Sequence, residues 1–94
     1  MRSRYVVWTP IVREKLKAFR SERFTPFETL DFISQVVLET EDLLKNPVLG
    51  KSYKEEAGKY KGISRIVIKK FQFYFKQVDN EVLIIAVLFP GENK

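Results

Sequence analysis

Three consecutive β-strands are predicted by residues 65–89, and this segment limits the possible folds most strongly. Its sequence is RIVIKKFQFYFKQVDNEVLIIAVLF. Apolar and polar side chains alternate through residues 63–69 and 71–78, the period of a strand with one buried face. The dipeptide Asp79-Asn80 tolerates positive φ and therefore predicts a two-residue hairpin turn. Residues 81–89 are apolar on both faces, which is typical of a central strand covered on both sides.

The N-terminal part predicts a strand that leads directly into a helix. Tyr5–Trp8 is rich in β-forming side chains. Thr9-Pro10 follows, with a good N-cap residue and a proline suited to the first helical position. The helix should end near residues 21–23. Its apolar stripe consists of Val12, Leu16 and Phe19, and its basic residues Arg13, Lys17 and Arg20 face elsewhere.

A second helix has a stronger start signal. Thr25 is a favourable N-cap, Pro26 suits the first position, and Glu28 completes a capping box. The helix can continue to Lys45, where Asn46-Pro47 stops it. Its apolar residues form two stripes, one with Phe27, Leu30, Ile33, Val37 and Leu44 and a roughly opposite one with Phe32, Val36 and Leu43. Such a helix is packed on two sides, against its own domain alone or against the domain and a partner.

The order of elements is therefore β-α-α-β-β-β, an α+β fold in a single domain over residues 1–94. The last three strands should form an antiparallel meander, although the Lys69-Lys70 connection contains no glycine and its turn type stays open. The N-terminal strand should join this small antiparallel sheet at an edge or beside the last strand. Both helices should pack on one face of the sheet.

Charge alternates along the chain and narrows the choice of partners. Residues 1–23 carry seven Lys or Arg against two acids, and residues 51–76 carry eight against two, within a net charge of +5. The segments 24–50 and 77–94 are acidic on balance. This pattern favours an anionic partner, either nucleic acid or an acidic protein segment, although the lysines could also serve solubility alone.

Several classes of function are made improbable by residue types that the chain does not contain. There is no cysteine and no histidine, so disulfides and thiol chemistry are excluded and a zinc site is not expected. We expect no metal and no cofactor. The apolar run near the N-terminus is too short for a signal peptide, and the longest uncharged apolar run, residues 82–90, is only strand-sized. These features predict a cytoplasmic protein with no membrane partner.

The order and spacing of these motifs resemble the RelE/ParE superfamily of bacterial toxins from type II toxin–antitoxin systems. The opening strand ends in the step Val7-Trp8-Thr9-Pro10, and the second helix ends in the segment LLKNPVLG at residues 43–50. In the sheet, Arg65 precedes alternating apolar residues, the aromatic step at residues 71–74, the acidic turn and the strand that begins at Val82. The resemblance covers nearly the whole chain and is closer to the ParE-like branch.

The resemblance implies a growth-arresting toxin that is neutralised by a cognate antitoxin. In this family the antitoxin supplies an extended, helix-rich segment that wraps the helices and sheet of the toxin. Predicted contacts for the antitoxin or the target are Phe32, Val36, Leu43, Lys51, Lys54, Lys59, Lys61 and Arg65. The three apolar members of this set could instead pack inside the domain.

The target is the point on which the superfamily divides. RelE-like members resemble ribosome-dependent mRNA endoribonucleases, whereas ParE-like members poison DNA gyrase by binding it. Metal-independent RNA cleavage needs a proton acceptor, a proton donor and cations near the phosphate. The candidates for these roles are Arg65, Lys69, Lys70 and Tyr74. A lysine of ordinary pKa is a poor base at neutral pH, and Lys69 and Lys70 could simply be solvated residues at a strand edge.

Three positions depart from the ribonuclease pattern. The chain has Gln72 and Glu92 where ribonuclease members carry arginines, and Phe89 where many superfamily members carry histidine. These departures favour a ParE-like inhibitor that needs no catalytic group, with DNA gyrase as the expected target. The alternatives are a RelE-type ribonuclease, a degenerate member that only binds antitoxin, and an unrelated nucleic-acid-binding domain.

Overall fold

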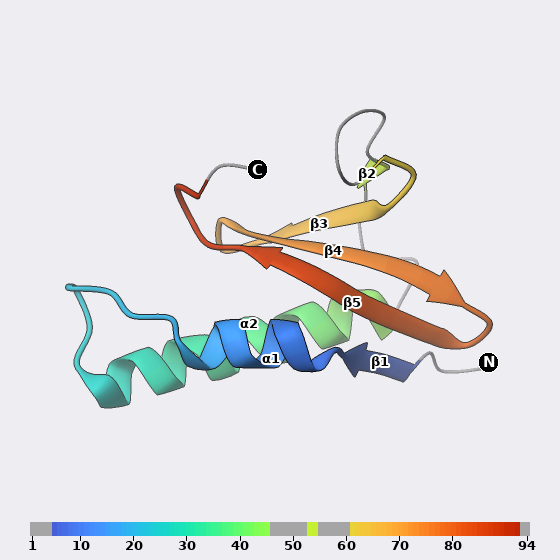
Figure 1. Ribbon diagram of the computed structural model, residues 1–94. Coiled ribbons are helices and arrows are strands. Elements are labelled where there is room, and N and C mark those ends of the chain that lie inside the picture. Colours follow the sequence, from blue (N-terminus) through green and yellow to red (C-terminus); the bar gives the residue numbers. More distant parts are fainter. Residues whose placement is uncertain (1–4, 46–52, 55–60, 93–94) are drawn as a thin grey trace.

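The computed structural model describes residues 5–45, 53–54 and 61–92 and has the expected α+β architecture. The five strands form one sheet in the order β1-β5-β4-β3-β2, and both helices lie on one side of it (Figure 1). The elements are β1 (Tyr5–Trp8), α1 (Pro10–Lys17), α2 (Pro26–Lys45), β2 (Tyr53–Lys54), β3 (Ser64–Ile68), β4 (Phe71–Val78) and β5 (Glu81–Leu88). The predicted fold class is confirmed.

The sheet differs from the expected antiparallel sheet in two details. Strand β1 lies beside β5, which is one of the two positions predicted for it. The two strands run parallel, however, so the sheet is mixed. Strand β2 adds a two-residue antiparallel pairing to β3 within a segment that the sequence predicts as loop. Such a short edge pairing has no alternating apolar pattern by which a sequence could reveal it. The β3-β4-β5 meander is antiparallel as predicted.

Helix α1 starts where Thr9-Pro10 predicts, but it ends several residues early. The Thr9 hydroxyl donates a 2.7 Å hydrogen bond to the Ile84 carbonyl instead of capping the helix, so it ties the start of α1 to β5. At the other end, Arg20 Nη1 donates to the carbonyls of Lys17 (2.9 Å) and Phe19 (2.7 Å). A cation bound to the terminal carbonyls stabilises the end of a helix, which accounts for its termination at Lys17.

Helix α2 begins with the capping box that the sequence predicts. The backbone N–H of Thr25 donates to Glu28 Oε1 at 2.8 Å, and the Glu28 N–H donates to Thr25 Oγ1 at 3.2 Å. The Thr25 backbone N–H, followed by the Thr25 side chain, lowers the pKa of the Glu28 carboxyl, because hydrogen bonds to the carboxylate favour its charged form. Neither α1 nor α2 is long and apolar enough to cross a membrane, within the ranges that the structure describes.

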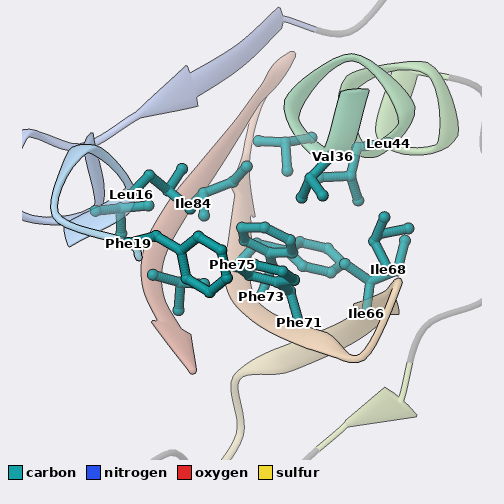
Figure 2. Close-up of a cluster of buried hydrophobic side chains, with 13 residues drawn as sticks. Leu16, Phe19, Val36, Leu44, Ile66, Ile68, Phe71, Phe73, Phe75 and Ile84 are labelled. Atoms are coloured by element: carbon teal, nitrogen blue, oxygen red, sulfur yellow. The ribbon is translucent and has the colours of Figure 1, made fainter. Parts of the chain in front are cut away.

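The core lies between the helices and the sheet and is dominated by phenylalanine. Phe71, Phe73 and Phe75 project from β4 toward the helices, as their alternation predicts (Figure 2). Phe19, just beyond α1, packs against Phe71 with ring centroids 5.2 Å apart. Trp8 packs edge-on against Phe73 at 5.6 Å. Offset and edge-to-face aromatic pairs of this kind add to the stabilisation that burial provides.

The second apolar stripe of α2 packs inside the domain, which is one of the two alternatives that the sequence leaves open. Val36 is completely buried against the sheet, and Phe32 and Leu43 pack beside it, so these three residues belong to the core and not to a partner surface. The true inward stripe also contains Thr29 and Thr40. Their hydroxyls donate to the carbonyls four residues earlier, at 3.0 and 2.7 Å, which allows polar residues to be buried. Because two threonines occupy the buried face, apolar periodicity alone does not identify all of its residues.

Candidate functional site

A groove of about 570 Å³ lies between α1 and α2. The two helices lie side by side beneath the sheet (Figure 1). The apolar lining comes from both helices and from the end of β1, and consists of Trp8, Leu16, Phe19, Leu30, Ile33 and Val37. A concave surface with mainly apolar walls is a usual binding site in proteins.

Basic side chains line the α1 wall of the groove. Arg13, Lys17 and Arg20 are spaced by four and three residues, which brings them to one side of the chain along and just beyond α1. All three are exposed. Lys17 has only a 3.7 Å ion pair with the equally exposed Glu14, which screening by water makes weak. The wall therefore presents a positive surface to any occupant of the groove.

The opposite wall, formed by α2, is apolar along part of its length and acidic at one end. Leu30 is 66% exposed although it lines the groove, and Phe27 nearby on α2 is 86% exposed. At the β1 end, Glu41 Oε2 accepts a 2.8 Å hydrogen bond from Trp8 Nε1. This bond holds the indole ring in place, and because indole is neutral, Glu41 keeps one negative charge at this end against the three positive charges of the α1 wall.

The helix-free face of the sheet holds two of the four catalytic candidates. Arg65 of β3 lies opposite Tyr74 of β4, and Arg65 Nη1 donates a 3.0 Å hydrogen bond to Gln72 Oε1. Tyr74 is fully buried, and Arg65 is half-buried. The arrangement supplies a cation, an amide and a phenol, but the phenol is not exposed to a substrate. A buried phenol cannot exchange a proton with a phosphodiester at the surface.

Lys69 and Lys70 lie apart from this pair. They form the turn between β3 and β4, four and five residues beyond Arg65 along the chain. Lys69 Nζ lies 3.8 Å from Glu39 Oε2 of α2, on the helix side of the sheet, whereas Arg65 Nη1 contacts Gln72 on the opposite face. The predicted catalytic residues are therefore divided between two places in the structure.

The remaining predicted contacts are lysines around β2. Lys61 is exposed, and Lys54 belongs to β2, where the structure describes the backbone. Lys51 and Lys59 lie outside the described residues. No shared site can be assigned to this group.

Glu92 forms an ion pair with Lys15, so its carboxylate has a structural role. Lys15 Nζ donates to both carboxylate oxygens of Glu92 at 2.9 Å and to the Val87 carbonyl at 2.7 Å. The Phe89 N–H donates to Glu92 Oε1 at 2.8 Å. This backbone hydrogen bond and then Lys15 lower the pKa of the Glu92 carboxyl. Glu92 thus joins the chain after β5 to α1, and its charge is already compensated by Lys15.

Within the described portions of the chain, no cluster of His, Cys, Asp or Glu is arranged to hold a metal ion.

The residues that sequence reasoning missed are those of the groove. The spacing of Arg13, Lys17 and Arg20 was a signal, because basic residues at positions i, i+4 and i+7 lie on one helix side.

Comparisons with protein-family models, curated proteins and solved structures found no match to this chain.

Proposed function

We propose that this chain is a RelE/ParE-like toxin of a type II toxin–antitoxin system, acts in the cytoplasm and inhibits its target by binding. DNA gyrase is the proposed target. A cognate antitoxin would neutralise the toxin by placing an acidic amphipathic segment in the groove between α1 and α2. The observation that carries this proposal is the pairing of an apolar groove with a basic wall.

The chemistry of the groove favours a partner of this kind. An amphipathic helix lays apolar side chains into a groove, and its flanking carboxylates would lie near Arg13, Lys17 and Arg20. The exposed side chain of Leu30 would lose contact with water on binding. Such burial is the usual source of affinity at a groove, whereas the charges select the partner and speed its association.

The positions of the four catalytic candidates favour inhibition by binding over RNA cleavage. Tyr74 is buried, Arg65 is hydrogen-bonded to Gln72, and Lys69 and Lys70 lie at a separate turn. A ribonuclease would need these groups to converge on one phosphodiester. An inhibitor needs only a complementary surface, and no bond-making group is required.

The target is tested by brief induction of the chain in a bacterium, with plasmid topology and messenger RNA integrity read from the same culture. We expect growth arrest with relaxed plasmid or broken DNA and intact messages. Cleaved messages with normal supercoiling would replace gyrase by the ribosome. Unchanged growth with both nucleic acids intact would contradict toxicity and leave a degenerate, antitoxin-binding member.

The groove is tested by co-expression with the product of a short reading frame beside the gene. Reversal of two charges, Arg13→Glu with Lys17→Glu, should weaken the complex by about tenfold or more, because carboxylates would then face carboxylates. Lys70→Glu with Lys76→Glu is the matched control, since both lysines are exposed and neither lines the groove. Equal effects of the double variant and the control would place the partner elsewhere.

A further inference from the structure

The turn between β3 and β4 has a backbone conformation that its residues disfavour. Lys69 has φ of 48° and Lys70 has φ of 72°, both in the left-handed region. Glycine, asparagine and aspartate are the usual residues there, because the Cβ of an L residue crowds the backbone, glycine has no Cβ, and the short side chains of Asn and Asp can hydrogen-bond locally. The other hairpin of the meander places Asp79 at φ 54°, a residue that tolerates it. Two consecutive lysines at such a turn cost folding free energy.

The exposed surface of the turn is positively charged, and the apolar side chains that flank the two lysines are not exposed. Lys69 and Lys70 are both exposed, whereas the flanking residues Ile68 and Phe71 are buried in the core. Lys69 Nζ lies 3.8 Å from Glu39 Oε2, and both of these side chains are over 40% exposed. An ion pair as long and exposed as this one contributes little and leaves the ammonium accessible.

The turn is also separate from the groove. Glu39, which Lys69 approaches, follows Val37 by two residues on α2. At 100° per residue, Glu39 points away from Ile33 and Val37, which line the groove. The turn and the groove therefore lie on different flanks of α2, and a segment bound in the groove would not cover the lysines.

We propose that the Lys69-Lys70 turn binds the phosphate backbone of a nucleic acid, at a site distinct from the groove. Lysine is depleted at protein–protein interfaces, whose binding energy comes mainly from buried aromatic and apolar anchors. Phosphate contacts need only accessible cations and are independent of sequence. The turn places two accessible ammonium groups at its tip, although lysine disfavours this backbone conformation. It therefore meets the requirement for phosphate contacts. This inference rests on the turn and not on the proposed toxin function.

The test separates charge from backbone strain with two double variants. Lys69→Asn with Lys70→Gly should raise the midpoint of thermal unfolding by about 5 °C, because the turn strain is relieved. The same variant should weaken binding to a 20-base-pair DNA duplex at low salt. The slope of log affinity against log salt should fall in magnitude by about 1.8, since two phosphate contacts are lost. Lys69→Gln with Lys70→Gln should lose the same affinity without the thermal gain.

Lys61→Gln with Lys76→Gln is the matched control, because it removes two exposed lysines elsewhere. Its affinity loss for the duplex should be at least about threefold smaller. A 20-nucleotide RNA, measured in parallel, should show the same dependence on the turn if the contact is to phosphate alone. An equal loss in the control would overturn the proposal, as would competition by polyglutamate as effective as that by DNA. An unchanged or lower unfolding midpoint for the Asn-Gly variant would overturn the strain argument.

Discussion

Helix α2 has two apolar sides, and they differ in what they contact. The core-facing side, with Val36 and Leu44, is closed by the sheet. The groove side, with Leu30, Ile33 and Val37, meets α1 only across a gap. The core-facing side includes Thr29 and Thr40, so it is no more apolar in sequence than the groove side. The difference shows that apolar periodicity locates the faces of a helix, whereas the partner surface decides which face becomes core.

The largest expected difference concerns two phenylalanines, one in the core that α2 covers and one on the exposed surface of α2. Phe73 is completely buried in the core, and Phe27 on α2 is 86% exposed. Phe73→Ala should lower the free energy of unfolding by about 3–5 kcal/mol, because it removes a large side chain and leaves a cavity. Phe27→Ala should change it by no more than about 0.5 kcal/mol. Urea unfolding of both variants measures the contrast, and comparable losses would mean that Phe27 is part of the core.

Much of the fold was predictable because its signals are local. The capping box at Thr25 and Glu28, the strands and the Asp79-Asn80 turn each depend on a few neighbouring residues. The α2 orientation was not predictable in the same way. Thr40 counts as polar in a periodicity argument, yet its hydroxyl bonds to the Val36 carbonyl within the helix and its methyl group is buried.

The candidate site was less predictable than the fold. The basic stripe of α1 is visible in the sequence, but the gap that turns it into a groove wall depends on how two helices sit on one sheet. The pairing of Lys15 with Glu92 joins residues 77 positions apart. A contact of that kind is set by tertiary packing, so Glu92 could only be read as an isolated charge.

A smaller effect is expected at Thr40, and it tests whether this residue acts as part of the apolar core. Thr40→Ser keeps the hydroxyl and removes the methyl group, which should lower the free energy of unfolding by about 1 kcal/mol. Thr40→Val keeps the shape and removes the hydroxyl. It should be neutral or slightly stabilising, because the Val36 carbonyl keeps its backbone partner. Urea unfolding compares the two, and a large loss in Thr40→Val would assign the hydroxyl a structural role.

The attachment of α1 to β5 should depend on pH through Glu92. Its carboxyl pKa is lower in the folded chain than its ordinary value of 4.5, first because of the Phe89 N–H and then because of Lys15. A depressed folded-state pKa contributes stability that is present above the unfolded value and is lost as the pH falls below it. Glu92→Gln should therefore be less stable than the unmodified chain at pH 7. The two should converge below the folded-state pKa, as thermal unfolding across pH would show.

The smallest expected effect is on the α1 wall of the groove. Lys17 is 74% exposed on its side chain, and its contact with Glu14 is long. Lys17→Gln should change the free energy of unfolding by no more than about 0.5 kcal/mol. A larger loss in urea unfolding would show that the basic wall supports the fold. A small change combined with weaker partner binding would mean that the core-facing side of α2 is built for stability and the groove side for recognition.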